Sequence, residues 1–178
     1  MTPTGQSSTA RRHEPAELAA RWMQWAAASS AVSNPLLDET GADAGRKQPQ
    51  DVWFLAGTMG GDSAHRQFAV PTGRPLFGPA FCMWGPEPIT ASDIASAVGT
   101  VRVDGHEVET VRAVAGPVRV RGGALNPVTR VPWLPTTMYL AGIWAGVAPL
   151  AVGTHFVEVR GGDGHGFETA VDAEIQVA

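Results

Sequence analysis

Alternation of apolar and polar side chains at a period of two is the pattern that most constrains how this chain can fold. From Phe167 to Val177, apolar residues and one threonine share a face, while acidic residues and a glutamine share the other. Thr154 to Arg160 alternates in the same way, with Phe156 as the one large apolar residue on the polar face. Turns rich in glycine and proline separate these segments from others of strand length. The pattern predicts a mainly β fold, an antiparallel two-sheet β-sandwich or jelly roll.

The densest apolar segment, Asp51 to Trp84, predicts three consecutive strands in the middle of this sandwich. They are expected over Val52–Ala56, His65–Val70 and Leu76–Trp84. Prolines at the start of and within the third strand indicate an edge position or a bulge. The glycine-rich segment Gly57–Gly61 lacks the Gly-Lys-Ser/Thr ending of a phosphate loop, so a hairpin connection is expected there.

Four further segments have clear secondary-structure signals. Asp104-Gly105, between two short valine-containing segments, predicts a hairpin with a type I′ turn. Thr137–Val147 is apolar on both faces, which predicts a central strand. Thr90 predicts the N-cap of a short helix over Ala91–Val98. The proline-rich segment Gly122–Pro135 is expected to be irregular, either as a lid over a site or as a plain covering loop.

A chain of 178 residues is expected to form one domain. We expect residues 1–14 to be a disordered tail and residues 15–178 to fold as a single β-sandwich domain. Trp22 and Trp25 recur at helical spacing, and their helix must end before Pro35. The two tryptophans either dock this helix onto a face or end of the sandwich or form an aromatic wall for a ligand.

The charge balance argues against several kinds of partner. A net charge of -4 disfavours nucleic acid and an anionic membrane. No apolar segment approaches transmembrane length, and no secretion signal follows the N-terminal arginine pair, so a soluble cytoplasmic protein is expected. The basic residues are arginines apart from Lys47, which together with abundant alanine and glycine indicates a bacterial genome. The single Cys82 excludes an intramolecular disulfide, and its apolar neighbours favour an inert thiol.

Arg66 and His155 are the two ionisable residues that the alternation places on inward faces. Arg66 shares a face with Phe68 and Val70, and a buried guanidinium needs a carboxylate, a set of carbonyls or an anionic ligand. Its two interpretations are an internal salt bridge and a ligand-anchoring arginine. His155 is either a core histidine, bonded to a carbonyl or to Asp38, or a general acid or base facing a pocket.

Metal and nucleophile sites have weaker signals. The acidic residues around Asp38 lack the alternating spacing of a calcium loop, so they are expected to cap backbone amides in a turn. The five histidines show no close ligand spacing, although side chains from separate strands can converge, and we expect no metal and no cofactor. No G-x-S-x-G elbow occurs, which argues against a serine nucleophile.

Several segments together resemble a family of uncharacterised bacterial β-sandwich proteins, many of them exported. The resemblance covers most of the chain and lies in Trp22–Trp25, Asn34–Gly41, Val52–Gly57, Arg66, Val70–Gly73, Leu76-Phe77, Pro149-Leu150 and Gly153–His155. The family has no assigned activity, so the resemblance implies the fold and gives weight to Arg66 and His155. Two departures, the apolar Phe81–Trp84 in place of a polar segment and the absence of a secretory segment, suggest a cytoplasmic relative with a more apolar interior.

These observations favour a cofactor-independent enzyme of small-molecule or secondary metabolism, an isomerase, cyclase or lyase that uses acid–base chemistry. The expected catalytic residues are His155, Arg66 and Asp38, in a pocket lined by Trp22, Trp53, Phe81, Trp84, Tyr139 and Trp144. The alternatives are a non-catalytic module that binds a hydrophobic or carbohydrate-like ligand and a structural or interaction protein. The expected partner is a small hydrophobic molecule. The oligomeric state stays open, with a homodimer as one option.

Overall fold

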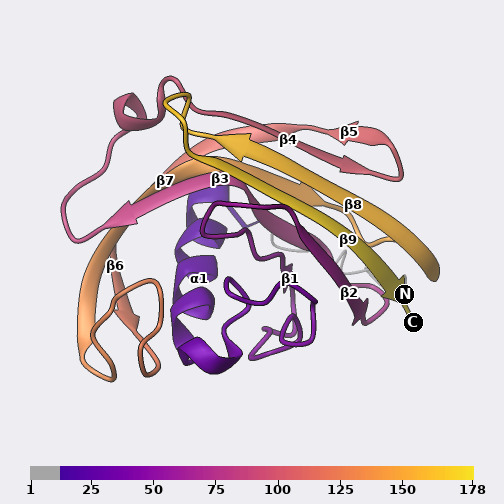
Figure 1. Cartoon of the computed structure of the whole chain (residues 1–178), viewed down its shortest axis with the longest axis horizontal. Coiled ribbons are helices and arrows are strands. Elements are labelled where there is room, and N and C mark those ends of the chain that lie inside the picture. Colours follow the sequence, from indigo (N-terminus) through magenta and orange to yellow (C-terminus); the bar gives the residue numbers. More distant parts are fainter. Residues whose placement is uncertain (1–12) are drawn as a thin grey trace, which may run out of the picture.

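The computed structural model describes residues 13–178 and is a β-sandwich with one N-terminal helix (Figure 1). A four-stranded sheet has the order β1-β3-β7-β6, and a five-stranded sheet has the order β2-β9-β8-β4-β5. The elements are α1 (Pro15–Ala28), η1 (Ala31–Ser33), β1 (Trp53–Phe54), β2 (Ala64–Val70), β3 (Leu76–Gly85), η2 (Ala91–Ile94), β4 (Val98–Val103), β5 (His106–Val108), β6 (Thr110–Arg121), β7 (Pro135–Val147), β8 (Gly153–Gly162) and β9 (Glu168–Val177). The predicted fold class is therefore confirmed, while residues 1–12 of the predicted tail lie outside the described residues.

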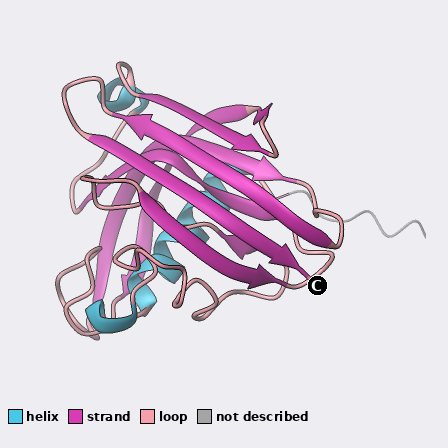
Figure 2. Cartoon of the chain, turned by 45° about the vertical axis from the view of Figure 1, so that its right-hand side comes forward, coloured by secondary structure: helices cyan, strands magenta, loops and turns pink. Residues whose placement is uncertain are grey.

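The helix adds a third layer to the two sheets. One apolar core lies between the sheets and a second lies between α1 and the outer face of the four-stranded sheet. Figure 2 shows the five-stranded sheet in front and α1 behind. In the second core, the ring of Trp144 stacks on Phe77 with centroids 5.3 Å apart and meets the edge of Trp22 at 5.4 Å. The interpretation in which the helical tryptophans dock the helix on a sheet is thus confirmed for Trp22 and Trp25, both buried.

Sheet membership differs from the expectation of three consecutive strands in the middle of the sandwich. β1 has only two residues, and β2 belongs to the other sheet, at its edge. β1 pairs with β3 and β2 pairs with β9 in parallel, so the sandwich is not wholly antiparallel. β3 is interior and carries a bulge between Pro79 and Phe81, which is one of the two roles predicted for its prolines.

Other predicted elements are confirmed with changed boundaries. β7 lies between β3 and β6 as the expected central strand. Asp104 and Gly105 have positive φ angles of 51° and 80°, as a type I′ turn requires. The helix predicted over Ala91–Val98 is only the 3₁₀ turn η2, although Thr90 and Asp93 form the predicted capping box. It ends early because Val98 already pairs with Gly162 at the start of β4.

The two sheets approach most closely where β3 meets β8. A Cβ atom placed on Gly161 would lie 2.0 Å from the carbonyl oxygen of Ala80, and one on Gly99 would lie 2.6 Å from the Cβ of Ala80. Only glycine fits at either position. Ala80 is the residue at the β3 bulge, between Pro79 and Phe81, so the bulged part of β3 is what faces both glycines.

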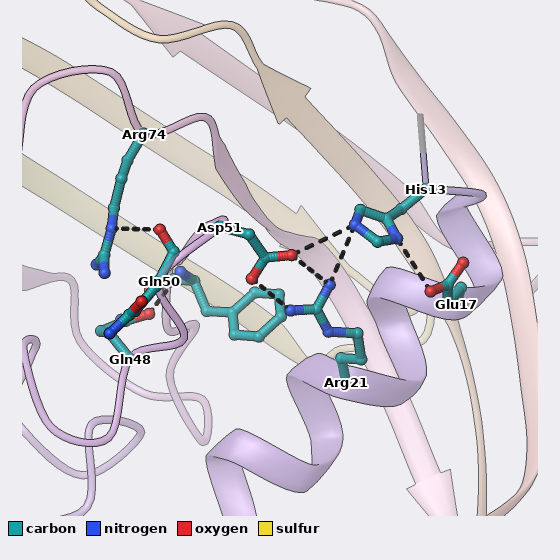
Figure 3. A network of polar contacts seen from close by, with 8 residues as sticks. His13, Glu17, Arg21, Gln48, Gln50, Asp51 and Arg74 are labelled. Atoms are coloured by element: carbon teal, nitrogen blue, oxygen red, sulfur yellow. Dashed lines mark hydrogen bonds and ion pairs between the residues drawn. The ribbon is translucent and has the colours of Figure 1, made fainter. Parts of the chain in front are cut away.

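Polar side chains hold β1 in place on the side away from β3 and beside α1 (Figure 3). The Gln48 amide accepts from the Phe54 N–H at 2.8 Å and donates to the Phe54 carbonyl at 2.8 Å, as a neighbouring strand would. Beside it, Arg21 of α1 donates two hydrogen bonds to the Asp51 carboxylate, at 2.9 and 2.6 Å. This pair ties the helix to the segment just before β1. His13 extends it into a polar cluster, because its two ring nitrogens lie within ion-pair distance of Glu17 and Asp51. Among residues 13–178, no helix is long and apolar enough to span a bilayer.

Candidate functional site

Arg66 is buried, with 4% of its surface exposed, and its donors are directed at backbone carbonyls. Nε donates to the carbonyl of Asp38 at 2.7 Å, one terminal nitrogen donates to Ala56 and the other donates to Gly57 at 3.0 Å. Burial lowers the pKa of Arg66, and the negative charge of Asp38 opposes this. Arg66 thus binds carbonyl oxygens in place of the predicted salt-bridge carboxylate, and it fastens two irregular segments to β2.

The Asp38 carboxylate caps a turn, as the spacing of its acidic neighbours predicted. Its two oxygens accept from the backbone N–H groups of Thr40, Gly41 and Asp43 at 2.8 to 3.0 Å, and from the Thr40 hydroxyl. Partial burial works to raise the pKa of Asp38, but these donors together lower it below its usual value. Asp38 therefore contacts Arg66 through its backbone carbonyl group. The Asp38 carboxylate instead binds the N–H groups of its own turn.

His155 lies at the end of the five-stranded sheet, in an ion pair with the Asp104 carboxylate at 2.7 Å. Its other ring nitrogen lies 2.9 Å from the carbonyl oxygen of Ala151. Both partners are acceptors, so both ring nitrogens must donate, and the imidazole is protonated in this geometry. Arg66 lines a cavity of about 20 Å³ and an outer groove of about 620 Å³, and His155 lines neither. The structure does not bring the two predicted catalytic residues together.

The His155–Asp104 pair predicts a pH dependence. The bonds to Asp104 and then to Ala151 raise the pKa of His155, and His155 and then the Phe156 N–H lower the pKa of Asp104. The histidine contribution to stability is lost as pH rises through its raised folded pKa, and the aspartate contribution is lost as pH falls through its lowered folded pKa. The pair therefore stabilises the fold most between about pH 4 and pH 6.5, the unperturbed values of the two groups.

Replacing Asp104 by asparagine tests this pair, because asparagine tolerates the positive φ of the turn. We expect the pKa of His155, followed by NMR titration of the ring protons, to fall towards its ordinary value. The loss of unfolding free energy should stay below about 1 kcal/mol because the pair is at the surface. An unchanged His155 titration would contradict the assigned partner.

The aromatic residues predicted to line a ligand pocket divide into two groups. Trp22, Phe81 and Trp84 line one pocket, together with Leu36, Gly57, Thr58, Met59, Pro79, Ala80, Cys82, Met83, Phe167 and Thr169. We call this the aromatic pocket; its volume is about 210 Å³. Trp53 stacks on Phe68 with ring centroids 6.1 Å apart, Trp144 is fully buried behind the sheet, and Tyr139 packs against Gly116. These last three residues lie outside the aromatic pocket.

The aromatic pocket exists because β1 is short. β1 pairs only with Leu76 and Phe77, so from Pro79 onward the structure describes no strand beside β3 on that side. The pocket borders this uncovered edge. The rest of its wall comes from Trp22 of α1, Leu36, the segment after β1 and the residues around the start of β9. Met59, Met83 and Phe167, which are 45%, 36% and 37% exposed, are among the large apolar side chains that remain exposed in the described chain.

Thr58 and Thr169 are the polar residues of the pocket wall. The period-two pattern placed Thr169 on an inward face, but the sequence indicated neither threonine as a site residue. Their hydroxyl oxygens lie 2.8 Å apart, Thr169 Oγ1 accepts from the Thr58 N–H, and Thr58 Oγ1 accepts from the Gly60 N–H. The two hydroxyl groups have two hydrogens, and their mutual bond uses one. The other hydrogen has no acceptor among the described residues, so it is free to donate a hydrogen bond.

Acid–base and metal chemistry have little support at this pocket. None of its lining residues is an Asp, Glu, His, Lys, Arg or Tyr. Burial raises the pKa of the Cys82 thiol, which makes it a poor nucleophile at neutral pH. Among residues 13–178, no group of three or more His, Cys, Asp or Glu side chains could hold a metal ion. The pocket can bind an apolar molecule but contains no group suited to proton transfer.

Comparisons with protein-family models, with curated proteins and with solved structures found no match. The resemblance to an uncharacterised bacterial family therefore stays a prediction.

Proposed function

We propose that the protein binds a small apolar molecule carrying one oxygen acceptor, without transforming it, in the aromatic pocket. The observation that carries this proposal is the coincidence of aromatic and methionine side chains with one donor hydrogen of the Thr58–Thr169 pair. Ligand pockets in general have apolar walls and a few placed polar groups that fix orientation. A ketone, aldehyde, ether or alcohol has the matching acceptor.

The pocket volume limits the ligand to a compact molecule. An apolar cavity of about 150 Å³ accommodates benzene, and the aromatic pocket has about 210 Å³. A bicyclic or branched molecule somewhat larger than benzene would fill this space. Methionine side chains at the mouth adapt their shape to such ligands because the thioether chain is unbranched and polarizable.

The acid–base enzyme expected from the sequence has less support than this binding function. Its two main residues have partners elsewhere: Arg66 donates to three carbonyls, and His155 donates to Asp104 and Ala151. A catalytic base must reach a substrate proton within hydrogen-bond distance. Neither residue lines the aromatic pocket. The non-catalytic ligand-binding module is therefore the alternative that better fits the lining of the aromatic pocket.

Two matched probes test the proposal: 1-indanone, a compact bicyclic ketone, and indane, the same ring system without the oxygen. Binding is measured by the change in tryptophan fluorescence, since Trp22 and Trp84 line the pocket. We expect both probes to bind and indanone to bind about fivefold more tightly, as one net hydrogen bond allows. The double variant Thr58→Val/Thr169→Val should bind the two probes equally.

The control for this double variant is Thr154→Val, which removes a hydroxyl bonded at 2.8 Å to Gln176 on the outer face of the five-stranded sheet, away from the pocket. It should keep the preference for indanone. Thermal denaturation checks that each variant is folded. If neither probe changes the fluorescence, or if the double variant keeps the preference, the proposed pocket chemistry is wrong.

A further inference from the structure

Five exposed apolar side chains gather at one end of the molecule, on η1 and the loop between β6 and β7. They are Val32, Leu125, Val131, Trp133 and Leu134, with exposed fractions of 93%, 78%, 40%, 66% and 66%. The C-terminal end of α1 and the β6–β7 loop lie together in the lower left of Figure 1. The backbone bond from the Ala31 N–H to the Ala124 carbonyl at 3.0 Å joins the two segments. We call this set the apolar tip.

The backbone conformation of the apolar tip adds a second unfavourable contribution to the free energy of folding, besides the exposure of apolar side chains. Leu125 and Trp133 have positive φ angles of 53° and 62°, and Arg130 between them has 57°. Bulky side chains rarely occupy this region, and asparagine or glycine is the usual residue there. Leu125 and Trp133 are thus disfavoured both by their exposure to water and by their backbone. Strained residues of this kind cluster at functional sites, which makes the apolar tip a candidate for a role in binding.

The loop that presents the apolar tip is held in place from inside. Asn126 is buried, accepts from the N–H groups of Val128 and Thr129 at 3.0 and 2.8 Å, and donates to the Gly123 carbonyl at 2.9 Å. The Gly123 N–H donates to Ala27 of α1, and the Trp133 N–H donates to Gly122, both at 2.9 Å. The exposed side chains therefore project from an anchored loop.

A basic recess adjoins the apolar tip. It has a volume of about 470 Å³, and its wall includes Arg46, Lys47, Arg121 and Trp133 but no Asp or Glu. The Asp43 carboxylate takes one donor of Arg46 at 2.9 Å from outside this lining, and Lys47 donates to the Ala28 carbonyl at the end of α1. The protein as a whole has a net charge of -4, so this local excess of cations runs against the average.

We propose that the apolar tip and the basic recess together form a docking surface for an anionic phospholipid bilayer. Tryptophan, leucine and valine side chains would enter the boundary between headgroups and acyl chains, and the recess would take a lipid phosphate. Tryptophan is suited to this boundary because its ring is amphipathic, and arginine and lysine beside apolar side chains complement anionic headgroups. The argument for this occupant is charge complementarity, because the recess wall has three cationic side chains and no Asp or Glu beside the exposed apolar residues.

Vesicle cosedimentation with the full chain tests the proposal. We expect the protein to bind mixed phosphatidylcholine–phosphatidylglycerol vesicles and to bind pure phosphatidylcholine vesicles much less. The double variant Leu125→Asn/Trp133→Asn should lose about tenfold or more in vesicle affinity because it removes two inserted side chains. The same variant should melt at the same or a higher temperature than the parent, since asparagine suits positive φ. Lost binding in a protein of undiminished stability separates docking from a structural role.

The electrostatic part has its own variant and control. Arg121→Gln should weaken binding to the anionic vesicles about fivefold, as removal of one interfacial charge does. The control pair is Val152→Asn, whose valine is 71% exposed in another loop, and Arg102→Gln on β4, and both should bind as the parent does. The proposal is overturned if the parent protein does not cosediment, if the tip variant binds normally, or if the recess binds inorganic phosphate by NMR while vesicles are ignored. If the double variant unfolds, Arg121→Gln decides the question.

Discussion

Replacement of Arg66 by methionine should lower the free energy of unfolding by about 3–5 kcal/mol, as removal of one partner from a buried charged network does. Methionine fills much of the volume but leaves the carbonyls of Asp38, Ala56 and Gly57 without their donors. Each unpartnered buried carbonyl costs about 1–3 kcal/mol. Urea denaturation followed by tryptophan fluorescence measures the loss.

Two comparisons show whether the carbonyl bonds cause this loss. Arg102→Met removes an arginine whose side chain is 55% exposed and should change stability little. Arg66→Lys keeps the charge, but an ammonium cannot reproduce the planar fork that reaches three carbonyls, so it should be intermediate. If Arg66→Met is as stable as the parent, the carbonyl bonds of the guanidinium do not stabilise the fold. The ligand-anchoring interpretation of Arg66, which lines the outer groove, would then be favoured.

The inward orientation of Arg66 could be predicted from the sequence, but its partners could not. The period-two pattern of β2 places Arg66 with the buried side chains whatever it contacts. Its acceptors belong to the turn at Asp38 and to the segment Ala56-Gly57, and both are irregular. No periodicity links such segments to a strand. The pattern therefore indicated a need for partners and left their identity open.

His155 shows the same limit for a different reason. The alternation of β8 correctly placed it on the inner face, but it lies near the end of its strand, beside the turn of the neighbouring hairpin. The residue that pairs with it, Asp104, was recognised only for its turn propensity. One side chain thus has two roles, a positive-φ turn position and an ion-pair partner, and the sequence indicates only the first.

The aromatic pocket could be predicted in part. Trp22, Phe81 and Trp84 were expected at a ligand site because they are large and aromatic. Thr58 and Thr169, 111 residues apart, meet only because β2 and β9 are neighbours in one sheet while β1 and β3 belong to the other. Period-two patterns assign faces to a strand but do not assign the strand to a sheet. The error over the membership of β2 and the failure to see the threonine pair thus have one cause.

Replacement of Gly161 by alanine should lower the free energy of unfolding by about 3 kcal/mol, at the upper end of typical overpacking costs. The added Cβ would lie 2.0 Å from the Ala80 carbonyl oxygen and 2.7 Å from its carbonyl carbon. These are backbone atoms, which cannot move aside as a flexible side chain would, so relief requires the sheets to separate locally. For a chain of this size the loss corresponds to a fall in melting temperature of about 6–12 °C. Because Ala80 also lines the aromatic pocket, the variant should bind 1-indanone more weakly even while folded.

Gly99 provides a control that distinguishes a clash with the backbone of Ala80 from a clash with its side chain. On Gly99, an added Cβ would meet the Cβ of Ala80 at 2.6 Å, so Ala80→Gly should restore stability to Gly99→Ala but not to Gly161→Ala, whose contact is with the carbonyl. Gly85→Ala, with no atom within 4 Å of its added Cβ, should change stability by less than about 0.5 kcal/mol. Rescue of both crowded variants by Ala80→Gly would contradict the backbone contact. Rescue of Gly99→Ala alone would show that the backbone of Ala80, and not its side chain, limits how closely β8 approaches β3 beside the pocket.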